Sequence, residues 1–165
     1  MKAIVAYFII TICSVGTIAQ NSNSYVFQNR EMFRGYGVIF TAAYKPNVIL
    51  KNKLTIYTPS KNEIEQAEVI LRNRYNIDLT TIIWFKPLKN VKKVYYKYNR
   101  QYLAYIDLKG NRKIIINMLK FGCKKKSMRK FVGWDSQFFV GFGEYYEYNV
   151  KTFEVDLDNH RLTLF

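Results

Sequence analysis

One stretch of the sequence, residues 100–118, restricts the fold more than any other. Two arms with many apolar residues, "RQYLAYI" and "RKIIINM", flank the short segment "DLKGN". The segment Asp107–Gly110 is typical of a type I turn followed by a left-handed residue, because Gly110 can adopt the positive φ that such a bulged turn needs. The stretch is therefore predicted to form a β-hairpin. The predicted register pairs Arg100 with Met118, Tyr102 with Ile116, Ala104 with Ile114 and Ile106 with Arg112.

The two faces of this hairpin differ in character. Side chains alternate between the faces of a strand, so one apolar set is expected to face the core. The other face mixes polar groups with Leu103, Tyr105 and Ile115, which would form a small apolar patch. The sequence leaves two alternatives open for this patch: the N-terminal segment covers it, or it is a contact for a partner. The expected core set is Tyr102, Ala104, Ile106, Ile114, Ile116 and Met118.

The clearest helix signal is "YTPSKNEIEQAEVILRNRY", residues 57–75. Ser60 and Glu63 have the spacing of a capping box at a helix start. Glu65 and Glu68 belong to the early turns, where the helix dipole favours acids, and Glu68 can pair with Arg72 one turn later. These carboxylates are therefore explained structurally rather than as a catalytic pair. The apolar stripe expected to pack on the hairpin is Ile64, Ala67, Ile70, Leu71 and Tyr75.

Several further stretches are expected to be strands, which sets the fold class. An α+β domain is predicted, in which one long helix packs on a curved antiparallel sheet of about five to seven strands, as in a cystatin-like or similar roll. The sheet would end with a turn at Asp158–His160 and a last short strand. The other predicted strands are 33–44, 47–57, 79–85, 134–142, 145–150 and 153–157.

The first 19 residues are predicted to be a secretory signal peptide. Lys2 provides the positive start, an apolar run follows, and Thr17 and Ala19 precede a cleavage site before Gln20. A single domain would then comprise residues 20–165, located in the periplasm or secreted. The alternative is a lipoprotein attached through Cys13. No later stretch is apolar enough to predict a membrane span.

The net charge of +14 is concentrated in the middle of the sequence. Residues 86–130 contain 15 Lys and Arg but only one acid, whereas residues 131–165 contain six acids and two bases. Basic and acidic strands could pair across the sheet. Alternatively, excess bases could form an exposed surface that attracts an anionic partner. The candidate anion-binding residues are Lys113, Lys120, Lys124, Lys125, Lys126, Arg129 and Lys130.

The predicted compartment limits the choice of partner. Anionic lipid, lipopolysaccharide, an acidic glycan or an acidic protein would each suit a basic surface outside the cytoplasm. Residues 85–100, "FKPLKNVKKVYYKYNR", interleave bases with aromatics as single-strand nucleic-acid grooves do. Predicted export nevertheless argues against nucleic acid as the partner.

No motif predicts a catalytic residue, a cofactor or a metal ion. The sequence has no phosphate-binding loop, no dinucleotide fingerprint and no Cys/His cluster at metal-ligand spacing. Cys123, next to Lys124, and the single histidine His160 are the best available pair for nucleophilic catalysis. A non-enzymatic binding module is therefore the preferred interpretation. A hydrolase or transferase with a pocket under the sheet, and a structural assembly component, remain alternatives.

Three stretches carry a resemblance to a known group of proteins: "YTPSKNEIEQAEVIL", "YNRQYLAYIDLKGNRKIIINML" and "WDSQFFVGFGEYYEYNV". Over roughly residues 55–150 the chain resembles small exported proteins of AT-rich Gram-negative bacteria of the Bacteroidota type. It departs from their pattern at Ala104, where they have a glycine, and near Phe142-Gly143, where they have paired glycines. The resemblance implies export and a compact single domain. It transfers no catalytic or binding residue.

Overall fold

The computed structural model describes residues 23–29, 33, 35–50, 52–81, 98–121, 129–139 and 143–164, with only the backbone for 75–81. The predictions for residues 1–19, Cys13, Cys123 and Lys124–Lys126 therefore lie outside the described residues. The same holds for residues 82–97 and 140–142. Within the described ranges, no helix has both the length and the apolar character needed to cross a membrane.

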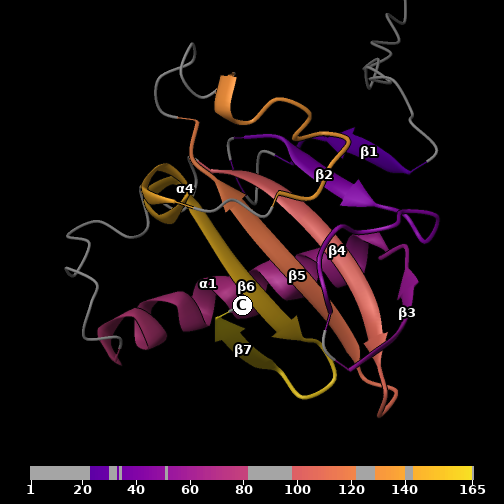
Figure 1. The fold of residues 1–165 in the computed structure, drawn as a ribbon. Helices are drawn as coiled ribbons and strands as arrows, with labels where there is room; N and C mark the ends of the chain where they lie inside the picture. Colours follow the sequence, from indigo (N-terminus) through magenta and orange to yellow (C-terminus); the bar gives the residue numbers. More distant parts are fainter. Residues whose placement is uncertain are drawn as a thin grey trace, which may run out of the picture.

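One long helix and a seven-stranded sheet make up the fold, as Figure 1 shows. The strand order is β1-β2-β4-β5-β6-β7, and β3 pairs with β4 beyond the end of β2. The coarse α+β prediction is confirmed. The strands are β1 Ser24–Phe27, β2 Gly37–Phe40, β3 Lys53–Tyr57, β4 Asn99–Asp107, β5 Arg112–Leu119, β6 Val150–Asp156 and β7 Arg161–Leu164; the helices are α1 Lys61–Thr81 and α4 Glu144–Asn149.

The sheet is mixed rather than purely antiparallel. Strand β2 runs parallel to β4, with Gly37 opposite Arg100, while the other pairings among the described strands are antiparallel. Parallel neighbours need a crossover connection, and here the chain passes through β3 and α1 between β2 and β4. The sequence prediction missed this pair because neither strand carries a local signal of its direction relative to the other.

The β4–β5 hairpin has the predicted register. Ala104 lies opposite Ile114 and Tyr102 opposite Ile116. Gly110 has a φ of 86°, so it supplies the left-handed residue of the turn. The Asp107 carboxylate accepts hydrogen bonds from the backbone N–H groups of Lys109 (2.8 Å) and Asn111 (2.9 Å), which fixes the turn. Local sequence rules were sufficient for this element.

The helix α1 begins at the predicted capping box. The Ser60 N–H donates to Glu63 Oε2 at 2.9 Å, and the Glu63 N–H donates to Ser60 Oγ at 3.3 Å. The helix continues to Thr81, so the predicted strand at 79–85 was wrong for its first three residues. The sequence between Lys61 and Thr81 contains no Pro or Gly that would end a helix earlier.

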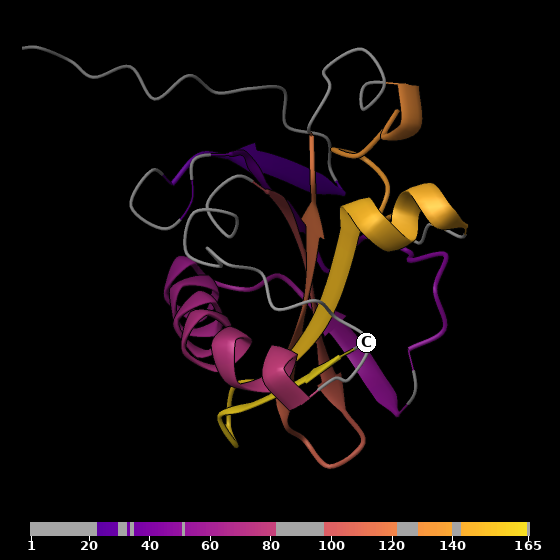
Figure 2. The same cartoon turned by 90° about the vertical axis from the view of Figure 1, so that its left-hand side faces the viewer.

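Each face of the sheet packs against a hydrophobic core. The inner face packs against α1, which lies along it in Figure 2. The outer face is covered by loops: Tyr44 and Leu50 follow β2, and Trp134 and Phe138 belong to the segment 129–139. Of the predicted helix stripe, the side chain of Tyr75 lies outside the described residues. The inner core includes the other four members of the stripe and most of the predicted hairpin face: Ile64, Ala67, Ile70, Leu71, Tyr102, Ala104, Ile114, Ile116 and Met118.

Two predicted strands in the C-terminal part, 134–142 and 145–150, are not strands at residues 134–139 and 145–149. Residues 131–137 form consecutive turns, and α4 occupies most of the predicted strand 145–150. Strand β5 is already paired with β4 on one edge and β6 on the other, so a further strand beside it has no free edge. The segment 129–139 instead crosses the outer face. The later predictions are confirmed: Phe153, Val155 and Leu157 are buried, and β7 follows the turn that contains His160.

Two predicted N-terminal strands are shorter than expected. The strand predicted at 33–44 is reduced to β2, and the one predicted at 47–57 begins only at Lys53. Leu54 was expected to be buried but is 62% exposed. A register shift between Lys53 and Thr55 in the pairing with β4 breaks the alternation on which that expectation rested.

Candidate functional site

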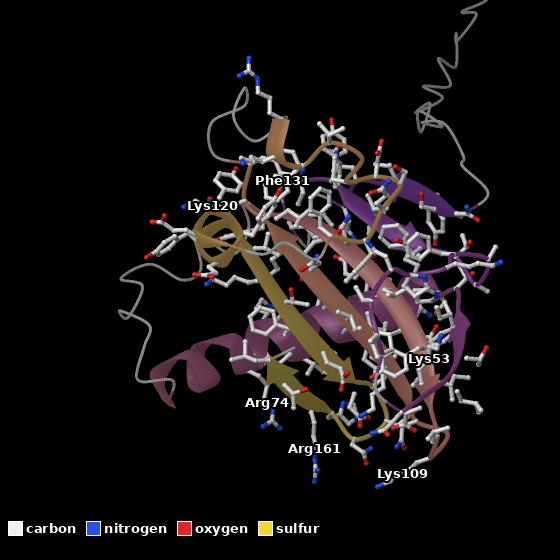
Figure 3. All side chains as sticks on the ribbon, in the orientation of Figure 1. Lys53, Arg74, Lys109, Lys120, Phe131 and Arg161 are labelled. Atoms are coloured by element: carbon white, nitrogen blue, oxygen red, sulfur yellow. The ribbon has the colours of Figure 1, made fainter. Side chains whose placement is uncertain are left out.

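The described bases of the stretch 86–130 lie at the two ends of the sheet, apart from Arg100 in the inner core. We call the end with the β4–β5 and β6–β7 turns the hairpin end, and the opposite end, with α4, Lys120 and Arg129–Lys130, the α4 end. Strand β5 runs from Arg112 at the hairpin end to Leu119 at the α4 end, a span of roughly 23 Å at 3.3 Å per residue. Figure 3 shows Lys109 and Arg161 at one end and Lys120 and Phe131 at the other.

At the hairpin end, Lys113 is engaged by two carboxylates. Its Nζ lies 2.5 Å from Asp156 Oδ2 and 3.9 Å from Asp107 Oδ2, and its side chain is only 16% exposed. Burial alone would raise the pKa of Asp156, but the hydrogen bonds from Lys113 and Asn159 outweigh it, and the pKa is lowered. Lys113 belongs to the predicted anion-binding set, and in the structure its ammonium group contacts carboxylates of the same chain.

Arg112 joins three elements at the same end. Its Nη2 lies 2.6 Å from Asp158 Oδ1, in the β6–β7 turn, and its Nη1 lies 3.1 Å from Glu63 Oε1, at the start of α1. The hydrogen bonds from Arg112 lower the pKa of Asp158 below its ordinary value. Arg112 and Lys113 therefore belong to a structural network with acids of the same chain, in which Lys113 and Asp156 form a cross-strand pair of opposite charge.

A further ion pair lies inside the inner core. Arg100 Nε is 3.1 Å from Glu68 Oε1, with side-chain exposures of 0% and 4%, and the Tyr102 hydroxyl donates to Glu68 Oε1 at 2.8 Å. The Arg100 guanidinium also lies 5.2 Å from the centroid of the Phe33 ring. The sequence prediction missed this pair. The sequence nevertheless carried a signal. Arg100 has the same strand parity as Tyr102, and Glu68 follows Ile64 by four residues on the helix, so both charged side chains fall on core-facing positions.

At the α4 end the bases face solvent. Lys120, Arg129 and Lys130 are exposed, and no carboxylate of the described ranges lies within ion-pair distance of them. Lys130 Nζ lies 5.9 Å from the centroid of the Tyr145 ring, an arrangement that suits a cation–π contact. These three residues are the part of the predicted anion-binding set that the structure brings to one exposed region.

A cluster of aromatic rings holds this region together. Buried Phe131 lies at its centre, with ring centroids 5.0 Å from Phe121, 5.9 Å from Tyr145 and 6.0 Å from Tyr146. The Tyr146 hydroxyl donates to the Lys130 carbonyl at 3.0 Å. Ring contacts of this kind add to the stabilisation from apolar burial. Arg129 and Lys130 are thereby held beside α4.

The backbone at the end of β5 provides a further anchor. The Lys120 N–H donates to the Asn149 carbonyl at 2.8 Å, so Lys120 is attached to the C-terminal residue of α4. Two large side chains of this region are strongly exposed: Val132 at 72% and Tyr148 at 70%. The α4 end therefore combines unpaired cations with apolar and aromatic groups on a fixed support.

Buried amides attach the segment 129–139 to the outer face of the sheet. Gln101 Nε2 donates to the carbonyls of Gln137 (2.8 Å) and Trp134, and Gln101 Oε1 accepts from the Phe139 N–H at 3.0 Å. Asn117 Nδ2 donates to the Phe139 carbonyl at 2.6 Å. Sequence reasoning missed this role of both amides. In the described part of the chain no buried side-chain polar atom lacks a partner, so the amides act structurally.

The predicted partner contact is buried. Leu103, Tyr105 and Ile115 belong to the outer core beneath Tyr44 and Phe138. The Tyr105 hydroxyl donates to Glu154 Oε2 at 2.6 Å, and burial followed by this hydrogen bond raises the pKa of Tyr105. The first alternative, coverage by the N-terminal segment, is met only in part: Tyr44 cooperates with Phe138 of the segment 129–139 in covering these side chains.

The candidate catalytic pair gains no support from the structure. His160 is exposed in the β6–β7 turn at the hairpin end, with a φ of 50°. Cys123 lies outside the described residues. Phe121, the described residue nearest to it in sequence, is at the α4 end. Among the described side chains, no group of three or more His, Cys, Asp or Glu is arranged to hold a metal ion.

The fold and the site define an α+β protein with a helix-covered mixed sheet and one cationic, aromatic end. Comparisons with protein-family models, with curated proteins and with solved structures find no match for the chain. The functional argument therefore depends on the geometry of the α4 end.

Proposed function

We propose that this protein is a non-enzymatic binding module that associates with an anionic component of the cell envelope through its α4 end. One observation carries the proposal: Lys120, Arg129 and Lys130 gather at the α4 end with no described carboxylate within ion-pair distance. Arg112 and Lys113 at the hairpin end and Arg100 in the inner core are, in contrast, paired with carboxylates. Exposed, unneutralised bases on a fixed support provide a field that attracts anions.

The location outside the cytoplasm belongs to the same proposal. It is supported by the signal-peptide pattern of residues 1–19 and by the resemblance to small exported Bacteroidota-type proteins. Anionic lipid, lipopolysaccharide, an acidic glycan and an acidic protein are the partner classes that fit this location. Export is tested by mass spectrometry of the native protein, for which we expect an N-terminus at Gln20. Cytoplasmic protein that retains Met1 would contradict it.

Binding through the α4 end is tested with two charge-matched variants. The first replaces Lys120, Arg129 and Lys130 by Gln, and the second replaces exposed Lys53, Lys109 and Arg161 of the hairpin side, labelled in Figure 3. Both remove three positive charges, so their net charges are equal. On a heparin column we expect the first variant to elute at clearly lower salt than the second. Equal elution of the two variants would mean that only net charge determines heparin binding, and it would contradict the proposal.

A further inference from the structure

We propose that the anionic partner is a lipid bilayer surface, and that Val132 and Tyr148 enter its headgroup region beside the three cations. This inference rests on the proposed function and names the partner class of the same end. Val132 and Tyr148 are 72% and 70% exposed, although large apolar and aromatic groups favour environments away from water.

Ring contacts and helix periodicity link these exposed groups to the cations. Lys130 Nζ lies over the Tyr145 ring, and Tyr148 follows Tyr145 by three residues, so the two tyrosines are neighbours on the surface of α4. Val132 directly follows Phe131, whose ring contacts Tyr145. The cations and the exposed apolar groups therefore share the α4 end.

A bilayer surface suits this combination better than the other anionic partners do. An acidic glycan offers charge but no apolar phase for Val132. A stable protein interface buries about 800 Å² per partner with close shape complementarity, whereas a short helix and a turn offer a small surface. At a bilayer surface, anionic headgroups attract Lys and Arg, and tyrosine is enriched at the level of the headgroups.

Two acids of the same helix oppose the attraction. Glu144 and Glu147 are exposed on α4, and Glu144 precedes Tyr148 by four residues, so it lies on the same side of the helix. Anionic lipid would repel both carboxylates. Replacing Glu144 and Glu147 by Gln is therefore expected to strengthen vesicle binding, an effect opposite in sign to that of removing the cations.

The experiment measures binding of the full protein to phosphatidylglycerol/phosphatidylcholine vesicles, with phosphatidylcholine vesicles and soluble heparin as separate arms. Each basic side chain replaced by Gln at the α4 end is expected to weaken anionic-vesicle binding about fivefold, the factor that corresponds to about 1 kcal/mol. The variant with Val132→Ser and Tyr148→Ser should lose several-fold in vesicle binding and keep its heparin affinity. Its matched control has Leu54→Ser and Leu108→Ser, which replace exposed side chains of the hairpin side.

Insertion is measured directly by fluorescence. Tyr148→Trp should be quenched by vesicles that contain brominated lipid, whereas Leu108→Trp should not. The two native tryptophans contribute equally to both variants. Since all the substituted side chains are exposed, circular dichroism and thermal unfolding should confirm unchanged folding.

The outcomes separate the two proposals. Unchanged vesicle binding of the Val132/Tyr148 variant, together with no quenching of Trp at position 148, would overturn the bilayer inference. If the Lys120/Arg129/Lys130 variant still bound heparin less tightly, the proposed function would stand with a soluble acidic partner. If that variant bound both vesicles and heparin as the unaltered protein does, the proposed function itself would fail.

Discussion

At the hairpin end of the sheet, Arg112 and Lys113 lie against carboxylates from three other elements, whereas at the α4 end Lys120, Arg129 and Lys130 face solvent. Both groups come from the same basic stretch of the sequence, and Lys113 and Lys120 are only seven positions apart. Strand β5 carries them to opposite ends, and Asp156 lies opposite Lys113 at the hairpin end only. A block of like charge in a sequence therefore does not define a charged surface.

The largest expected effect concerns the base that the structure buries. Arg100→Met would leave Glu68 buried without its cation, so we expect a loss of about 3–5 kcal/mol in the free energy of unfolding. Urea denaturation at pH 7 measures the change. In the double variant Arg100→Met with Glu68→Met, no buried charge remains, and much of the loss should be recovered. A double variant as unstable as the single one would contradict this account of the pair.

A direct comparison of the two ends follows from Lys113 and Lys120. Lys113→Gln removes the partner of the Asp156 carboxylate in a mostly buried position, and we expect a loss of about 2 kcal/mol. Lys120→Gln should change the free energy of unfolding by less than about 0.5 kcal/mol. Both values come from urea denaturation under identical conditions. Similar losses of stability for the two variants would contradict the conclusion that the base is structurally paired at the hairpin end and unpaired with described carboxylates at the α4 end.

Two glycines test whether both ends belong to one cooperative unit. Gly110 and Gly143 have φ values of 86° and 96°, and a Cβ at either would meet no described atom within 4 Å. Substitution by Ala therefore costs backbone strain alone. We expect about 1 kcal/mol at Gly110 and about 1–3 kcal/mol at Gly143, whose ψ of 167° places it in a region that is essentially restricted to glycine. Thermal unfolding should show both losses if α4 unfolds together with the sheet. A loss for Gly110→Ala only would show that α4 unfolds separately.

The smallest expected effect is a pH dependence at the hairpin end. Asp156 and Asp158 have lowered pKa values in the folded protein, so their stabilisation is present above the ordinary value of about 3.9 and is lost as the pH falls through the lowered pKa. The exposed Arg112–Asp158 pair should contribute less than about 1 kcal/mol. Asp158→Asn should therefore show a slightly smaller loss of stability between pH 5 and pH 2 than the unaltered protein. An equal or larger loss would argue against this contribution.

Short-range features were predictable because their causes are short-range. The capping box of Ser60 and Glu63 and the turn at Gly110 each depend on residues within four positions. Strand alternation then placed Tyr102 and Ile116 on the core face. The predictions failed where the partner is distant in sequence. The sequence predicted a strand at 134–142. Instead, Asn117 Nδ2 donates a hydrogen bond to the Phe139 carbonyl, so a side chain rather than a neighbouring strand binds this backbone.

For the candidate site, the residue types could be predicted from the sequence, but their surroundings could not. Lys120, Arg129 and Lys130 were in the predicted anion-binding set and are exposed. Lys113 was in the same set, because nothing in the neighbouring sequence indicates that it pairs with Asp156, 43 positions away. Leu103, Tyr105 and Ile115 were correctly placed on the second face of the hairpin. Their burial depends on Tyr44 and Phe138, which come from loops on either side in sequence.

By itself, the sequence determined where the long helix starts, how the central hairpin pairs and which of its faces packs against that helix. The reason is that caps, turns and side-chain alternation are set by neighbouring residues. Only the tertiary structure decided which bases are neutralised, which apolar face is covered and that α4 forms beside Phe131. Those outcomes depend on contacts between residues tens of positions apart, and chain topology alone brings them together.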